Sequence, residues 1–148
     1  VFKQTIEPII ASFKPDIIVS VHGVDVHYLD PLTHMSCTLN TLYQIPYIIK
    51  SLADTYTNGK VMMFGGGGYN IWKVVPRAWS HVFLALIEAP PPQGQLPSQW
   101  LEKWQPYATC TLPKHWQDDK ENYIDIPREE EITATNLKHA QQVISWFK

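Results

Sequence analysis

Two short runs without internal charges, each followed by a segment of helical periodicity, constrain the fold of this chain more than any other feature. The runs are DIIVSV at residues 16–21 and KVMMF at residues 60–64, and each is uncharged after its first residue. Runs of this kind are typical of strands that are covered on both faces. The order strand, helix, strand, helix therefore predicts an α/β fold with a parallel sheet and right-handed crossovers.

Amphipathic helices are predicted on either side of these strands. Apolar residues recur at helical spacing along residues 2–13, although Pro8 lies within this segment. Residues 46–56 show the same spacing, and the TNG sequence at 57–59 is expected to end that helix. The expected helix starts are, in chain order, residue 2, Pro46, Pro76 and, for the last helix, Thr133 or Thr135 as the N-cap.

The residues after Ala89 differ in character. Residues 89–97 are rich in proline and are predicted to form a connector. Residues 98–127 contain three tryptophans and little periodicity, so we expect an irregular segment packed through its aromatic rings. We therefore predict two parts, a main α/β part at 1–89 and a Pro/Trp-rich tail at 90–148 that ends in an amphipathic helix.

Composition excludes several classes of function. The 148 residues carry a net charge of −2 without a basic patch, which argues against nucleic acid or an anionic membrane as the main partner. The longest apolar run, VFLALI, is too short to cross a bilayer. The two cysteines lack CxxC spacing, which argues against a disulfide scaffold and is typical of a reducing compartment. We therefore expect a cytoplasmic protein.

Polar residues with possible chemistry follow each predicted strand. VHGVDVHYLDPLTH at 21–34 holds three histidines and two aspartates, and GGGGY at 65–69 places a tyrosine behind four glycines. Ligands of open α/β sheets bind beyond the carboxyl ends of the strands. We therefore expect both stretches on one edge of the sheet and treat them as one candidate site.

Each of these residues also has a plainer interpretation. Asp30 precedes a proline, and a lone Asp-Pro pair is more often a turn than a metal site. His27 is interpreted as a polar group paired in the interior. His22 and His34 have no evident partner residues in the sequence, which favours the plainer interpretation for both. The glycines complete neither GxGxxG nor GK[ST], which disfavours nucleotide binding. A tight turn explains the glycines but not Tyr69, whose phenol is suited to donate a hydrogen bond to a developing oxyanion.

Together, GVDVHYLDPLTH and GGGGYNIWKVVPRAW resemble the histone deacetylase superfamily, and most of all its bacterial acetoin utilisation protein branch. The resemblance covers residues 1–89 and, less specifically, the tail. It implies the arginase/deacetylase fold, of which this chain would be the C-terminal part. It also implies metal-dependent hydrolysis of acyl-lysine amides, with zinc as the expected metal and ferrous iron as the alternative.

The resemblance implies roles for individual residues. Asp30 corresponds to a metal ligand, and Tyr69 corresponds to the residue that polarises the amide carbonyl and stabilises the tetrahedral intermediate. The further residues that it implies are Gly67 and Gly68, whose backbone would line the acyl-lysine channel, and Asp25 and His27, which would at most support the ligands from behind.

The other parts of such a site are expected outside this chain. Catalytic zinc takes three protein ligands and a water molecule. The family supplies its other two ligands from an Asp-x-His motif and its general base from a His-His pair. This chain has no His-His, and its one Asp-x-His, at 25–27, lies in the wrong motif. We therefore expect the isolated chain to be inactive, to bind no metal tightly and, because a cut sheet has a bare edge, to self-associate.

The resemblance also suggests a substrate and a setting. It implies an acetylated protein substrate, with acetyl-CoA synthetase as the expected one and acetoin catabolism as the setting. Two alternatives stay open: a non-enzymatic binding module on the same fold, and a deacetylase of small acetylated amines. Residues outside this chain would decide between them.

Overall fold

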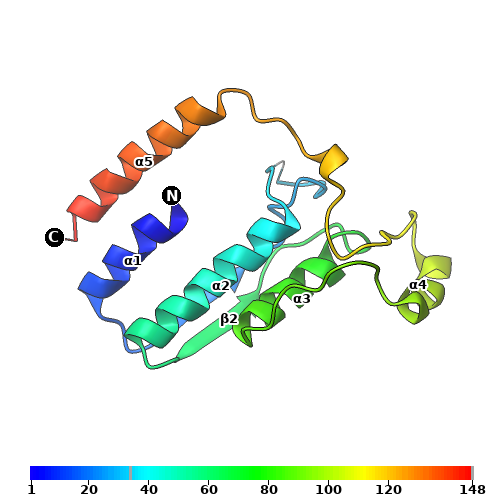
Figure 1. Cartoon of the computed structure of the whole chain (residues 1–148), viewed down its shortest axis with the longest axis horizontal. Coiled ribbons are helices and arrows are strands. Elements are labelled where there is room, and N and C mark those ends of the chain that lie inside the picture. Colours follow the sequence, from blue (N-terminus) through cyan, green and yellow to red (C-terminus); the bar gives the residue numbers. More distant parts are fainter. Residues whose placement is uncertain (34, 148) are drawn as a thin grey trace. The chain divides into compact units, whose positions relative to one another are not determined.

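The computed structural model describes residues 1–33 and 35–147, so His34 lies outside the described residues. Helices and strands alternate from residue 2 to residue 86, as predicted (Figure 1). Within the described ranges, every helix is too short or too polar to cross a membrane. In chain order the elements are α1 (Phe2–Phe13), β1 (Ile18–His22), α2 (Leu39–Tyr56), β2 (Val61–Gly65), α3 (Val75–Leu86), α4 (Ser98–Trp104), the 3₁₀ turns η1 (Gln105–Tyr107) and η2 (Lys120–Asn122), and α5 (Glu129–Ser145).

The two strands form one parallel sheet, which confirms the predicted fold class. The Ile18 amide donates to the Lys60 carbonyl at 3.1 Å, and farther along the Val24 amide donates to the Gly67 carbonyl at 2.6 Å. Residue numbers therefore rise together along both partners, which is the pattern of a parallel pair. Both stretches of the candidate site consequently leave the sheet at the same edge.

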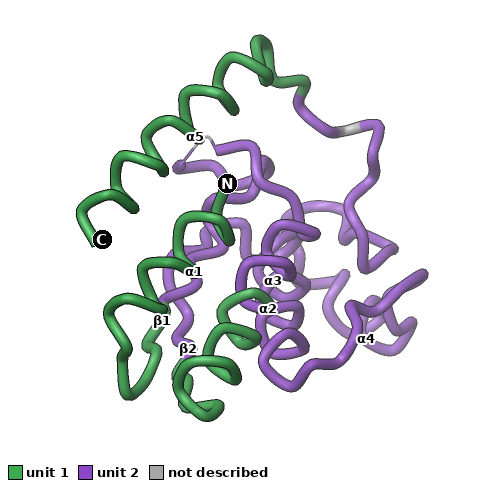
Figure 2. The backbone as a smooth tube through the Cα atoms, turned by 60° about the vertical axis from the view of Figure 1, so that its left-hand side comes forward, with its two compact units in different colours: residues 1–20, 48–62, 125–148 green, residues 21–47, 63–124 purple. Residues whose placement is uncertain are grey.

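Contacts divide the chain into two compact units (Figure 2). In the first unit α1 packs against α5, and the Ser12 hydroxyl donates to the Phe147 carbonyl at 2.6 Å. The second unit contains every residue of the candidate site that the structure describes. The predicted boundary after residue 89 stays a prediction. The first unit comprises residues 1–20, 48–62 and 125–148, and the second comprises residues 21–47 and 63–124.

The second unit is built around a small apolar core. Its members come from the loop after β1, the start of α2 and the segment that opens α3. The core therefore fixes the positions from which both candidate stretches extend. The buried members are Val24, Leu39, Leu42, Val74 and Ala78, and Val26 and Val75 pack against them.

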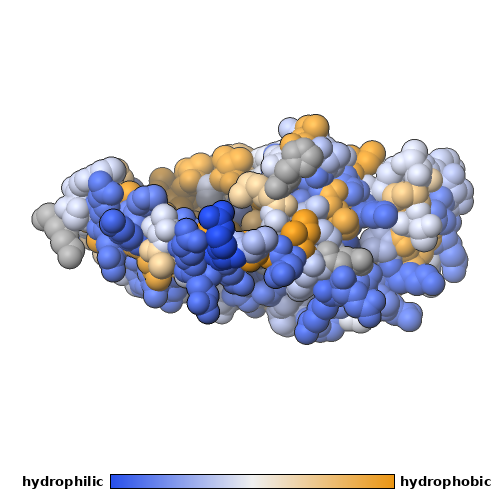
Figure 3. All heavy atoms as spheres, turned by 90° about the horizontal axis from the view of Figure 1, so that it is seen from above, coloured by the Kyte–Doolittle hydropathy of each residue, from blue (hydrophilic) through white to orange (hydrophobic). Residues whose placement is uncertain are grey.

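The strands are covered less completely than predicted. Val19 and Val21 in β1 are 57% and 69% exposed, and Met62 and Phe64 in β2 are 47% and 49% exposed. Side chains alternate along a strand, so these residues form one face of each strand. The prediction of cover on both faces is therefore wrong for the described residues. Figure 3 shows apolar side chains reaching the surface among hydrophilic ones.

The start of α2 corrects another prediction. The proline pattern predicts a start at Pro46, but α2 begins at Leu39 and Pro46 lies inside it. The helix begins earlier because the carboxylate of Asp118 accepts the Leu39 amide at 2.8 Å and satisfies a free N–H of the first turn. This capping group lies 79 residues away in the sequence, so local patterns do not reveal it.

The tail is more regular than predicted. Residues 98–104 form α4, so the prediction of an irregular segment is wrong there. The last helix begins at Glu129, and the predicted N-cap at Thr133 or Thr135 is therefore wrong. Three glutamates, 129–131, occupy the first turn of α5, where the helix dipole favours negative charge.

Candidate functional site

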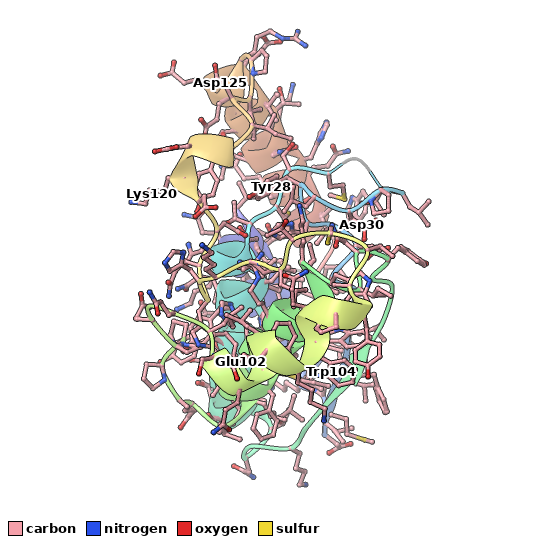
Figure 4. The ribbon with its side chains drawn as sticks, turned by 90° about the vertical axis from the view of Figure 1, so that its right-hand side faces the viewer. Tyr28, Asp30, Glu102, Trp104, Lys120 and Asp125 are labelled. Carbon is pink, nitrogen blue, oxygen red and sulfur yellow. The ribbon has the colours of Figure 1, made fainter. Side chains whose placement is uncertain are left out.

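The loop after β1 folds through two consecutive turns that lead to Asp30, which Figure 4 labels. The His27 amide donates to the Val24 carbonyl at 3.3 Å, and the Asp30 amide donates to the His27 carbonyl at 2.8 Å. The Asp30 carboxylate then accepts the Leu32 amide at 2.9 Å, which is the hydrogen bond of an Asx turn. Asp30 is buried, with 5% of its surface exposed.

The carboxylate of Asp30 also reaches the second stretch. Its Oδ2 accepts the Tyr69 amide at 2.9 Å. The side-chain amide of Asn70 donates to the Leu29 carbonyl, one residue before Asp30, at 2.9 Å. The two stretches that follow the strands are thus joined by hydrogen bonds, as expected from the parallel sheet.

Asp30 is held as a carboxylate. Burial raises its pKa, but backbone N–H donors outweigh this effect and leave the pKa below its ordinary value. A carboxylate is a usual zinc ligand, and a catalytic zinc site needs three protein ligands. Across residues 1–33 and 35–147, no group of three histidine, cysteine, aspartate or glutamate side chains is placed to bind a metal. Asp30 therefore suits one ligand position, and the described residues do not complete the set. The N–H donors to Asp30, in order of effect, belong to Leu32, Tyr69, Asn70 and Thr33.

Tyr69 is fixed through its backbone while its side chain reaches the surface. The residue is 52% exposed, and its amide is held by Asp30. The next residue, Asn70, leads into α3, because its carbonyl accepts the amides of Val74 and Val75 at 3.1 Å. The phenol is therefore accessible on a backbone that is fixed against the Asp30 carboxylate.

No member of the glycine run has a positive φ, so close packing rather than backbone conformation accounts for the glycines at 66–68. A Cβ on Gly66 would lie 2.9 Å from the Gly23 nitrogen, and a Cβ on Gly68 would lie 2.6 Å from a methyl group of Val24. The run is thus a tight turn packed on the loop after β1. The role of Gly67 and Gly68 in lining a substrate channel stays a prediction.

Asp25 packs into the glycine run. Its carboxylate occupies the space that a side chain at Gly67 would need, and it also lies close to Gly23. The Asp25 amide donates to the Gly67 carbonyl at 3.3 Å, and the Asp25 carbonyl accepts the Thr33 hydroxyl. Asp25 therefore holds the loop against the turn, and its role behind the metal ligands stays a prediction.

His27 is paired in the interior, in agreement with the plainer of its two interpretations. The residue is fully buried, and its Nε2 lies 3.1 Å from both carboxylate oxygens of Asp118. Its Nδ1 accepts the Leu29 amide at 3.1 Å. A ring nitrogen that accepts a hydrogen bond carries no proton, so the ring proton is on Nε2 and is donated to Asp118. The Tyr28 ring stacks on His27 with the ring centroids 4.5 Å apart.

Asp118 is the centre of a buried polar cluster that sequence patterns do not reveal. Besides the bond from His27, it accepts the Leu39 amide at 2.8 Å and lies 3.5 Å from Nη2 of Arg77. Burial raises the pKa of Asp118, but these donors and the Arg77 charge outweigh burial and leave the pKa lowered. The local signal is the acidic pair of the QDD sequence, which does not point to any partner.

Arg77 connects the tail to α3. Its Nη1 donates to the carbonyls of His115 and Gln117 at 3.2 and 2.9 Å. Its Nε donates to the Lys73 carbonyl at 2.8 Å, one turn earlier in the chain. With Asp118 on the same guanidinium, the segment before η2 is fixed against the helix that follows Tyr69.

Two further histidines are buried in this unit. His22, at the end of β1, is 8% exposed, and burial lowers its pKa. His81, on α3, is 3% exposed, and its Nδ1 lies 3.2 Å from the Leu39 carbonyl. Within the part of the chain that the structure describes, Nε2 of His81 has no hydrogen-bond partner. A cavity of about 80 Å³ borders His81, which is room for a water molecule.

Known proteins resemble this chain over most of its length. A model of the histone deacetylase domain matches residues 1–86. The acetoin utilization protein AcuC of Staphylococcus xylosus is 81% identical over 148 residues, which are all of this chain and 38% of that protein. The AcuC proteins of Staphylococcus aureus (strain MRSA252) and Bacillus subtilis (strain 168) are 60% and 40% identical. They match over 99% and 97% of this chain and 38% and 37% of their own lengths.

The match extends to a solved structure, that of the histone deacetylase Clr3. It covers 95% of this chain and 25% of that chain, with a TM-score of 0.49 and 20% identity. The chain spans about 38% of the length of the curated relatives that it matches. The domain model covers more than half of the chain and confirms the resemblance predicted from the two motifs. The chain therefore belongs to the histone deacetylase family.

Proposed function

We propose that this chain supplies one metal ligand and the oxyanion-stabilising tyrosine to the active site of a metal-dependent lysine deacetylase. The contact between Asp30 and Tyr69 carries the proposal. The carboxylate that would bind the metal accepts, at 2.9 Å, the amide of the tyrosine that would bind the substrate carbonyl. Family membership supports the reaction class, and the lowered pKa of Asp30 supports its role as a ligand.

Each residue would act on a different part of the reaction. A bound zinc or ferrous ion would supply a Lewis acid and an activated water. Asp30 would present its charge to the cation from a backbone fixed by the Asx turn. The Tyr69 phenol would donate a hydrogen bond to the amide oxygen as negative charge develops there. The remaining ligands and the general base would come from parts of the protein outside this chain.

The proposed substrate is an acyl-lysine side chain of a protein. It would pass along the backbone of Gly67 and Gly68, which are half-buried. Acetyl-CoA synthetase is the proposed substrate protein. Acetoin catabolism is the proposed setting, and the names of the relatives support the setting. Cys37 and Cys110 are both free thiols, which supports a reducing, cytoplasmic location.

Two substitutions in the complete protein that contains this chain separate the two roles. Tyr69→Phe removes one oxyanion donor, so kcat on an acetyl-lysine peptide should fall by roughly 10²–10³-fold while the metal content stays unchanged. Asp30→Ala removes a ligand, so the purified protein should lose its metal. Metal analysis beside steady-state kinetics measures both effects.

The matched control is Tyr107→Phe, at an exposed position on η1, which should keep the wild-type kcat. Equal metal loss in Tyr69→Phe and Asp30→Ala would show that the two roles are assigned wrongly. A Tyr69→Phe enzyme as active as the control would remove the proposed role of the phenol.

A further inference from the structure

One buried carboxylate in the tail contacts both halves of the candidate site. The carboxylate of Asp118 accepts a hydrogen bond from Nε2 of His27, which lies on the loop that carries Asp30. It also lies 3.5 Å from the guanidinium of Arg77, on the helix that follows Tyr69. A buried carboxylate is stable only when hydrogen-bond donors compensate its charge. The donor groups of His27, Leu39 and Arg77 must therefore point at Asp118, and this requirement fixes their orientation.

His27 transmits this constraint to Asp30. Because Asp118 holds Nε2, the other ring nitrogen is aimed at the Leu29 amide and accepts it at 3.1 Å. The carbonyl of His27 accepts the Asp30 amide at 2.8 Å. Both amides are thus bound by one residue, the Leu29 amide by the imidazole ring of His27 and the Asp30 amide by its backbone carbonyl, and the ring is bound by Asp118.

A second path leads from Asp118 toward Tyr69. Arg77, on α3, donates through Nε to the Lys73 carbonyl at 2.8 Å, and the Lys73 amide donates to Oδ1 of Asn70 at 3.0 Å. The same Asn70 side chain donates to the Leu29 carbonyl at 2.9 Å. The two paths therefore meet at Leu29, directly before the carboxylate that accepts the Tyr69 amide.

We propose that Asp118 is a positioning residue that, acting through His27, sets the direction of the Asp30 carboxylate relative to Tyr69. Its effect on catalysis rests on the function proposed above, whereas its effect on the loop does not. The proposal assigns a task in the active site to a tail residue 91 positions away from its histidine partner.

The test uses Asp118→Asn in the complete protein. Asparagine has the same shape and keeps an acceptor for the Leu39 amide, but its NH₂ group replaces the oxygen that faces Arg77 and one of the two oxygens that face His27. We expect kcat on an acetyl-lysine peptide to fall by roughly 10–100-fold, the usual cost of losing a group that orients a ligand, with KM nearly unchanged. Asp119→Asn, its exposed neighbour, is the matched control and should keep wild-type kinetics.

Hydrogen exchange followed by mass spectrometry gives a readout that does not depend on activity. In Asp118→Asn, peptides covering residues 26–33 and 66–72 should exchange faster, because they contain the amides bonded to Asp30. Peptides covering residues 48–56 of α2 should exchange at the wild-type rate. Faster exchange throughout the protein would overturn the proposal in favour of a general structural role, and so would unchanged exchange in the loop.

A pair of variants at His27 keeps the test decisive if Asp118→Asn does not fold. The amide of glutamine can donate to Asp118 and accept the Leu29 amide, whereas leucine can do neither. Hydrogen exchange at residues 26–33 should therefore be slower in His27→Gln than in His27→Leu, and His27→Gln should have the higher kcat. Equal behaviour of the two variants would overturn the proposal. If the wild-type protein deacetylates no peptide, the proposed function fails, while the exchange experiment still decides the positioning role.

Discussion

Gly67 has no room for a side chain of its own, because the carboxylate of Asp25 occupies that position. We predict that Gly67→Ala lowers the free energy of unfolding by about 1–3 kcal/mol, the usual range for overpacking. The matched control is Gly65→Ala, whose Cβ would lie 3.4 Å from the Trp79 ring and needs little adjustment. Urea denaturation of the two variants measures the difference.

Removing the obstructing carboxylate should relieve this clash. In a Gly67→Ala background, Asp25→Ala should therefore cost less stability than it does in the wild-type protein. Strictly additive losses, or equal losses at Gly65 and Gly67, would show that the close approach does not limit this turn.

The sequence predicts the position of a single site residue when that residue lies next to a strong local pattern, such as a strand. Asp30 and Tyr69 each follow a predicted strand, so the rule for parallel sheets is enough to bring their segments together. Asp118 lies in a segment without periodicity, and its partner His27 is 91 residues away. Its position depends on tertiary contacts, which no local pattern encodes.

The helix α3 contains a buried histidine, His81. Burial lowers the pKa of His81; the Leu39 carbonyl opposes this shift and the charge of Arg77 adds to it. The ordinary value is 6.5, so below that pH the unfolded chain takes up the proton more readily than the folded chain. The stability that neutral His81 contributes is therefore complete above pH 6.5 and is lost as the pH falls toward the lowered folded pKa.

We predict that His81→Phe makes stability less dependent on pH over this window. The urea midpoint of the wild-type protein should fall between about pH 7.5 and 5.5, and that of the variant should fall less. His139→Gln, at an exposed position on α5, is the control and should follow the wild-type protein. If His81→Phe loses as much stability as the wild-type protein, His81 is not the group responsible.

Local sequence patterns predict some of the helices and strands but not others. The helix at 2–13, both strands and α3 follow from hydrophobic spacing, because their own side chains decide where they pack. The start of α2 does not follow, since its capping carboxylate comes from Asp118. The start of α5 is set by three glutamates in its first turn, which outweigh the hydroxyl side chains that favour a later start.

The whole chain exposes one apolar face of each strand. We predict that the purified 148-residue chain self-associates, because Val21 and Phe64 are exposed on a sheet that has only two strands within the described residues, so that each strand has an open outer edge. We also predict that it deacetylates no peptide, because the described residues do not supply the three protein ligands of a catalytic zinc site. Light scattering over a range of concentrations measures the association. Val21→Lys should weaken it, because a charge on an edge strand opposes pairing, whereas Thr135→Lys on α5 should not. A monomeric mass at high concentration would contradict the prediction.

The long-range bond between His27 and Asp118 also orders events during synthesis on the ribosome. At roughly 5–20 residues per second, the 91 residues between the two partners take about 5–20 seconds to make. During that interval the nascent chain holds the loop of Asp30 with its histidine unpaired and α2 without its capping carboxylate. A nascent chain that stops short of residue 118 would expose this loop to proteases and chaperones, however well its strands and helices have formed.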